Sequence, residues 1–264
     1  MQKIKIKENN FLKKIFIKFC RKFGFELIDQ NKLLIPTSDK NINENINILN
    51  HKNITLPLGE VKITRKINSL LIIFRSFTNE NKLLSQNKKR IFEKEKKEYT
   101  FRSLQSICKN ITNLKKELSN FDIFLKIIDD NSKIDVIDQI NKICQKNNIL
   151  YEISNLNIKE FSDEMKFQNN ERMLSHNAHI YCSKKYAKDS KFDLLFFVED
   201  DYIHEDDALI EMVYSYQKIS SQLNNELIMC PADYPYLYIK SSLTKNFVGF
   251  KKHWCVVNQS LCTY

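Results

Sequence analysis

The chain has 264 residues, a formal net charge of +10 and a hydrophobic fraction of 42%, which suits a globular protein of one large domain or one domain with an appendage. No apolar run approaches the ~20 residues that cross a bilayer, so a membrane-spanning helix is excluded. The seven cysteines are scattered without a CxxC pair, which argues against zinc and indicates reduced thiols in a cytosolic setting.

The first predicted element is a basic amphipathic helix near the N-terminus, ended by Gly24. Leu12, Phe16 and Phe19 recur at helical spacing, and lysines lie mostly on another face. Two interpretations stay open: residues 11–25 bind an anionic membrane surface, or the helix packs on the main domain. The next stretch is polar and rich in asparagine, so we expect a helix and linker over residues 1–65 and the main domain over 66–264.

From residue 69 onward, short apolar segments alternate with amphipathic ones. Strands are expected at 69–74, 121–128, 149–154, 193–198 and 226–230, and helices at 100–118, 135–147, 171–188 and 207–223. This alternation predicts an α/β fold with a mostly parallel sheet flanked by helices.

Acidic residues follow two of these strands. One strand ends in Asp129 and Asp130, and another ends in Glu199, Asp200 and Asp201. Carboxyl ends of parallel strands share one edge of the sheet, where ligands bind. Side chains two apart in an extended chain point the same way, so Glu199 and Asp201 can face one ligand together. Without a cation or a basic partner such adjacent acids would repel one another, and carboxylates suit Mg²⁺ or Mn²⁺. The plainer alternative is that the acids are turn or helix-cap residues.

The segments FDIFLKIIDDNS and FFVEDDY, in this order and with matching helices between them, resemble the second strand and the acidic DXD motif of GT-A glycosyltransferases of the family 2 type. SLLIIFRSFTN is similar to their first strand and the loop that contacts the nucleotide. The resemblance covers about Ser69 to Cys230. It implies a Rossmann-like GT-A fold and a Mn²⁺- or Mg²⁺-dependent transfer from a nucleotide-diphosphate sugar.

The resemblance also implies roles for individual residues. Asp130 would contact the base, Asp200 would lie near the ribose or diphosphate, and Asp201 would bind the metal ion. The implied nucleotide-binding residues are Arg75, Ser76, Asp129, Asp130, Arg172 and Asp200, and the implied metal ligands are Glu199, Asp201 and His253. Asp233 is the candidate for the base that deprotonates the acceptor hydroxyl. Only 63 residues follow Asp201, so the catalytic domain would be short at its C-terminus.

The sequence therefore predicts a glycosyltransferase of cell-surface polysaccharide or lipopolysaccharide synthesis. Its acceptor would be a glycan or a lipid-linked molecule, and it would be cytoplasmic and peripheral on the inner face of the membrane. One alternative is a nucleotidyltransferase, although three glycines in the chain argue against a Gly-rich phosphate loop. The other is a non-enzymatic basic protein that binds membrane or nucleic acid. No nucleic-acid motif is present, so we expect no nucleic-acid partner.

Overall fold

The computed structural model describes residues 11–25, 62–79, 82–83, 86–89, 94–161, 171–232 and 246–257. Of these residues, 62–231 and 248–253 belong to the compact unit that holds the sheet. Helix α1 (Phe11–Lys22) belongs to a separate unit and is followed by Gly24, whose φ of 81° is left-handed. The described end of the predicted linker packs on the sheet-containing unit, where the backbone N–H groups of Thr64 and Arg65 each donate to Ser221 Oγ at 3.0 Å.

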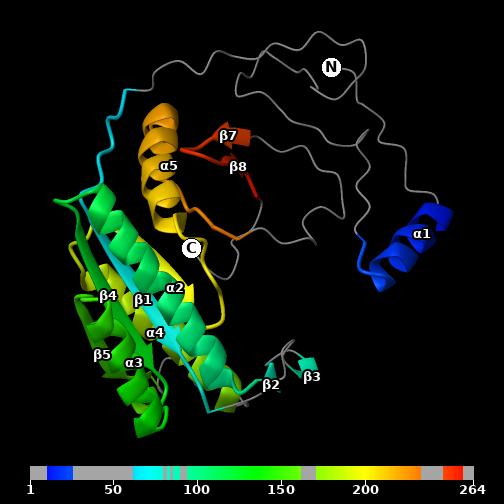
Figure 1. Ribbon diagram of the computed structural model, residues 1–264, viewed down its shortest axis with the longest axis vertical. Coiled ribbons are helices and arrows are strands. Elements are labelled where there is room, and N and C mark those ends of the chain that lie inside the picture. The colour runs from blue at the N-terminus through cyan, green and yellow to red at the C-terminus, as the bar shows by residue number, and fades with distance from the viewer. Residues whose placement is uncertain are drawn as a thin grey trace. The chain divides into compact units, whose positions relative to one another are not determined.

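Four parallel strands form the central sheet in the order β5-β4-β1-β6 (Figure 1). They are β1 (Ser69–Ser76), β4 (Asp122–Asp129), β5 (Tyr151–Asn155) and β6 (Leu194–Glu199). The chain moves outward from β1 to β4 and β5 and then returns to place β6 on the other side of β1. The prediction of an α/β fold with a parallel sheet is confirmed, and the topology is compatible with a Rossmann-like fold.

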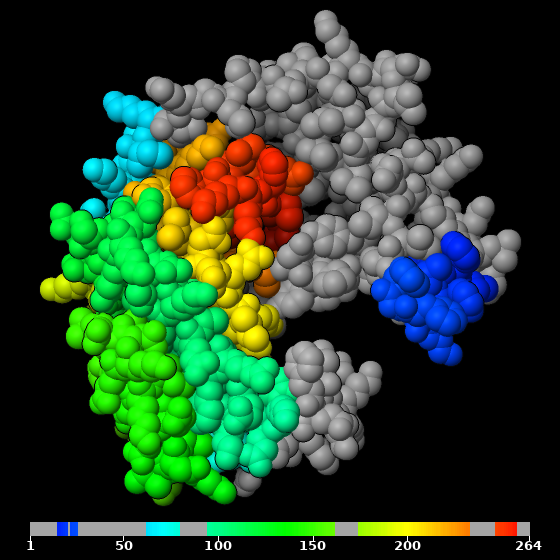
Figure 2. Space-filling view, viewed as in Figure 1, coloured from blue at the N-terminus to red at the C-terminus, as the bar shows by residue number. Residues whose placement is uncertain are grey.

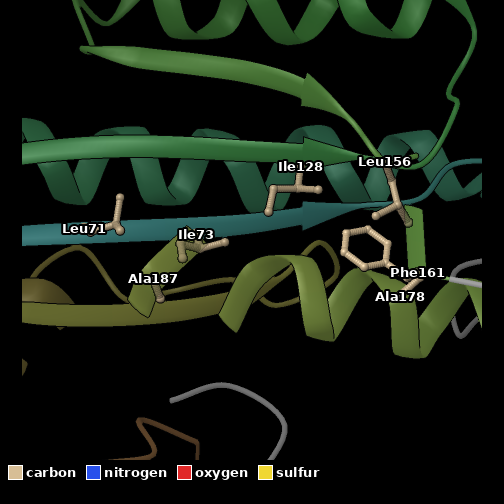
Figure 3. Packing of buried hydrophobic residues seen from close by; sticks show 7 residues of the cluster. All are labelled: Leu71, Ile73, Ile128, Leu156, Phe161, Ala178 and Ala187. Carbon is tan, nitrogen blue, oxygen red and sulfur yellow. The ribbon is translucent and has the colours of Figure 1, made fainter. Parts of the chain in front are cut away.

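Helices follow these strands and cover the sheet. They are α2 (Lys96–Glu117), α3 (Ile134–Lys146), α4 (Glu171–Asp189), α5 (Ala208–Leu223) and the short 3₁₀ helix η2 (Ile158–Phe161). Figure 3 shows α4 on one side of β1 and β4, with Ala187 next to Ile73 and Ala178 next to Phe161. Helix α2 crosses the other side of the sheet.

Strand β1 is buried on both faces, since every residue from Leu70 to Phe74 is at most 1% exposed. This explains why its sequence is continuously apolar rather than alternating. Leu71 and Ile73 belong to the cluster packed on α4. Because side chains alternate along a strand, Arg75 continues the α4 face and Ser76 continues the α2 face.

Some predicted elements differ from the observed ones. Helix α2 begins at Lys96, four residues before its predicted start. The strand predicted at 226–230 is wrong, because these residues are irregular and Ile228 is 77% exposed. After the left-handed Asn224, this stretch is held instead by Glu226, which accepts a hydrogen bond from Tyr216 and pairs with Arg65.

Two short pairs of strands were not predicted. They are β2 (Lys82–Leu83) with β3 (Gln86–Lys89), and β7 (Asn246–Val248) with β8 (His253–Cys255). Strands of two to four residues carry too few side chains to show an alternation of apolar and polar residues.

The packing of β1 on α4 gives a direct test of the core. We expect Ile73→Ala to lower the free energy of unfolding by about 2–5 kcal/mol, because Ile73 is fully buried and the change leaves a cavity. Ile134→Ala is the matched control: Ile134 is 81% exposed, so its loss should stay within about 0.5 kcal/mol. Urea unfolding measures both, and equal losses would contradict this description of the core.

Candidate functional site

The two predicted acid clusters lie on the same edge of the sheet. Ser76 is paired in register with Asp129 on one side of β1, and Arg75 is paired with Glu199 on the other. One strand, β1, therefore separates the acids of β4 from the acids of β6. The chain continues from β1 to β4 and β5 on one side of the sheet and then places β6 on the other side of β1, so the strand order reverses between β1 and β6. Open α/β sheets bind ligands at the carboxyl ends of the strands at such a point.

The β4 acids are buried and hydrogen-bonded within the protein. Asp129 accepts from Ser76 Oγ at 2.5 Å and from the backbone N–H of Ser132 at 2.7 Å, so it fixes the turn that follows β4. Asp130 points to the α4 side, where it accepts a hydrogen bond from Ser175, and also accepts from Asn131 Nδ2 at 3.1 Å. Both carboxylates are therefore held in defined orientations.

Arg75 and Glu199 form an ion pair on the α4 face of the edge. Arg75 Nη2 lies 2.7 Å from Glu199 Oε1, and the two side chains are 11% and 26% exposed. Burial raises the pKa of Glu199, Arg75 opposes this, and the neighbouring Asp201 and Asp200 raise the pKa further. Within the described part of the chain, the buried Nε of Arg75 has no hydrogen-bond partner. A buried donor without a partner is costly, so this edge favours an acceptor group at Arg75.

Asp200 is buried on the opposite face, beneath the first turn of α2. Its carboxylate pairs with Lys96 Nζ and accepts hydrogen bonds from Thr100 Oγ1 at 2.8 Å and from the backbone N–H of Phe77 at 3.0 Å. Burial raises the pKa of Asp200, whereas the charge of Lys96 lowers it. These contacts connect β6 to the loop after β1 and to α2.

Glu199 and Asp201 form ion pairs with different cations. Asp201 Oδ2 lies 3.2 Å from Lys96 Nζ, on the same ammonium that binds Asp200, whereas Glu199 pairs with Arg75. The reason is that β6 ends at Glu199 and the chain turns at 200–201, so the alternation of an extended strand stops there.

The described residues do not fit the predicted metal centre. Among them, no three His, Cys, Asp or Glu side chains are grouped closely enough to hold a metal ion. The acids at the end of β6 have Arg75 and Lys96 as cationic partners, so their repulsion is offset without an added ion. The predicted ligand His253 lies in β8 with its side chain exposed.

The turn that precedes His253 is bound to α5 rather than to the acids of β6. The backbone N–H groups of Phe250, Lys251 and Lys252 all donate to the carboxylate of Glu211 on α5. Figure 2 shows the turn (red) against α5 (orange). Contact with α5 therefore sets the position of this turn.

The remaining predicted residues are less fully described. Arg172 lies in the first turn of α4, but its side chain is outside the described part. Asp233 lies outside the described residues altogether, so the predicted base stays a prediction. Ser76 is buried and serves as the donor to Asp129.

A separate open groove of about 490 Å³ lies between the N-terminal halves of α2 and α3. It is lined by Lys97, Glu98, Phe101, Arg102, Gln105, Asp135 and Gln139. None of the predicted site residues is among them, and the charges of its walls are mixed. The acid-bearing edge therefore stays the better candidate site.

Two residues of the site were missed by the sequence analysis. Lys96 lies in a run of charged residues, which is typical of a solvated surface, and Ser175 lies in the predicted third helix without a motif. Lys96 lies four residues before Thr100, so extending the predicted helix by one turn would have placed both side chains on the same helix face.

Comparisons of the chain with family models, with curated proteins and with solved structures found no match.

The buried histidine beneath Arg75 generates a pH-dependent prediction. His179 Nε2 donates to the Ile128 carbonyl at 2.7 Å, and burial, followed by the charge of Arg75, lowers the pKa of His179 to about 3. The folded state keeps it neutral while the unfolded chain takes up a proton near pH 6.5. Stability should therefore fall as the pH falls below ~6.5, by about 2 kcal/mol at pH 5 from this residue.

Urea unfolding at pH 7 and pH 5 tests this effect. His179→Gln should be less stable at pH 7 but should lose about 2 kcal/mol less than the wild type on going to pH 5. His253→Gln is the control, because its exposed side chain should leave the pH dependence unchanged. The same pH dependence in all three proteins would contradict the buried, neutral state of His179.

Proposed function

We propose that the protein is a GT-A type glycosyltransferase that uses a nucleotide-diphosphate sugar. The observation that carries the proposal is the position of the acids: those of β4 and β6 flank β1 at the edge where the strand order reverses. Ligands of open α/β sheets bind at such a point. The order of the motifs in the sequence and the order of the strands both agree with the resemblance to the family 2 type.

The β4 side and the β6 side of the edge suit different parts of the sugar nucleotide. Near β4, Asp130 and Asn131 offer a carboxylate and an amide that can recognise a nucleobase, and they are already positioned by Ser175 and Asn155. Near β6, the guanidinium group of Arg75, which pairs with Glu199 through Nη2, can also donate to a phosphate oxygen. The acceptor would be a glycan or a lipid-linked molecule, and its hydroxyl group needs a base, for which Asp233 stays the candidate.

A nucleotidyltransferase could use the same edge, and the products distinguish the two activities. A glycosyltransferase releases the nucleoside diphosphate, whereas a nucleotidyltransferase releases pyrophosphate. The loop after β1 reads FTNEN and has no glycine, which disfavours the close backbone approach to phosphates that many nucleotidyltransferases use. The binding-protein alternative explains Asp129 and Asp200 as turn and helix-anchoring residues, but it gives no role to the buried Arg75 donor.

Nucleotide binding tests the proposal. Calorimetry with UDP, GDP and CMP, each with Mn²⁺ and with EDTA, should show binding of at least one nucleotide. Asp130→Asn should weaken that binding at least tenfold, or about 1.4 kcal/mol, because the base loses a charged acceptor. Asp122→Asn is the matched control, since Asp122 starts the same strand at the opposite edge and is exposed. Failure of the folded wild type to bind any nucleotide would contradict the proposal.

Helix α1 suggests where the enzyme would work. Phe16, Phe19 and Phe23 are 57–65% exposed, and residues 11–25 carry five Lys or Arg and no acid. Apolar side chains beside basic ones suit the surface of an anionic membrane. No helix in the described ranges is long and apolar enough to span a membrane. We therefore propose that α1 binds the membrane face that presents the lipid-linked acceptor.

Flotation with lipid vesicles tests this role of α1. The full chain should float with vesicles that contain about 30% phosphatidylglycerol and much less with pure phosphatidylcholine, because both apolar and ionic contacts contribute. The double variant Phe16→Gln/Phe19→Gln should lose most of the flotation. Ile203→Gln removes an exposed apolar side chain from the sheet-containing unit and should float like the wild type. Equal flotation of all three proteins would contradict a membrane role for α1.

A further inference from the structure

The acids at the end of β6 already have a cation of their own. We propose that Lys96 takes the place that the resemblance gives to a divalent metal ion, and that Lys96 and Arg75 together bind the donor's diphosphate. The inference rests on the proposed function, because it assumes a nucleotide-diphosphate ligand at this edge. It adds a residue that no motif indicated and removes the requirement for Mn²⁺ or Mg²⁺.

The position of Lys96 supports this assignment. Its side chain is only 5% exposed, and its ammonium group contacts Asp200 and lies 3.2 Å from Asp201 Oδ2. Lysine side chains are rarely buried unless they are paired, so two carboxylates at one ammonium define a specific position. Bridging two adjacent carboxylates is also the electrostatic role that a metal ion would have had here.

The charges at this edge nearly balance without an added ion. Arg75 and Lys96 oppose Glu199, Asp200 and Asp201, which leaves one net negative charge among the five groups. That charge is offset by the Phe77 N–H and the Thr100 hydroxyl, which donate to Asp200, and by the N-terminus of α2, which begins at Lys96. Three acids that are balanced in this way have little remaining affinity for a divalent ion.

Arg75 provides the second cationic group. Its guanidinium group pairs with Glu199 through Nη2, while its buried Nε has no hydrogen-bond partner among the described residues. A guanidinium group held by a carboxylate on one side can donate to a phosphate oxygen from another. Arg75 reaches the edge from the α4 face and Lys96 from the α2 face, so a diphosphate bound at the ends of β1 and β6 would lie between the two cations.

Calorimetry on the full chain separates this inference from a metal site. UDP or GDP, whichever the wild type binds, should have affinities in EDTA and in Mn²⁺ that agree within threefold. Binding of CMP alone, which has no diphosphate, would overturn the inference. Lys96→Met should weaken binding in EDTA at least tenfold. The control Lys97→Met removes the neighbouring lysine, which pairs with Glu95 at the surface, and should bind like the wild type. Circular dichroism checks that each variant is folded.

Asp201→Asn gives a test that does not depend on removing the buried lysine. If Lys96 is the cation, this change should tighten binding in EDTA, because a negative charge that competes for Lys96 is removed. If a metal ion is the cation, the same change should weaken binding in Mn²⁺. The sign of the effect decides between the two even if Lys96→Met fails to fold.

The outcomes also separate this inference from the proposed function. Nucleotide binding that requires Mn²⁺, or binding in EDTA that Lys96→Met leaves unchanged, would overturn the role of Lys96 while the proposed function stands. Absence of binding of every nucleotide under every condition would overturn the proposed function and the inference with it.

Discussion

The pairing of buried Asp200 with Lys96 is the interaction on which the candidate site depends. Asp200 directly follows β6 and joins the end of that strand to two other elements. These are the loop after β1, through the Phe77 N–H, and the first turn of α2, through Lys96 and Thr100. Breaking a buried charge pair by removing one partner costs about 3–5 kcal/mol, so these elements are held together at the carboxyl edge. The same pairing determines the charge that any ligand meets there.

Burial on both faces made the sheet and its acid-bearing edge predictable. The apolar runs of β1, β4 and β6 predicted parallel strands, and the acids directly after two of them predicted one shared edge. The partners of those acids were not predictable, since Lys96 is 104 residues from Asp200 in the chain and lies in a lysine-rich run. The different ion-pair partners of Glu199 and Asp201 were not predicted, because they depend on where the strand stops. Strand ends are the least certain part of a sequence prediction.

Side chains alternate along β1, so the residues of the candidate site lie on two opposite faces of the sheet. Arg75, Glu199 and Asp130 lie on the α4 side, whereas Asp200 and Lys96 lie on the α2 side. Asp129 fixes the turn after β4 and accepts a hydrogen bond from Ser76 at the end of β1. The edge thus combines fixed acceptors near β4 with cationic donors near β6, which is the basis for proposing a nucleoside-diphosphate ligand.

The central claim is that this edge, and no other surface of the sheet-containing unit, binds the nucleotide. Amide NMR spectra of the ¹⁵N-labelled protein, titrated with UDP, GDP and CMP in turn, test it most directly. The account predicts shifts at the amides of Phe77, Asn131 and Asp201, and none at Asp122 at the opposite end of β4. Shifts confined to the groove between α2 and α3, or no shifts with any of the three nucleotides, would contradict it.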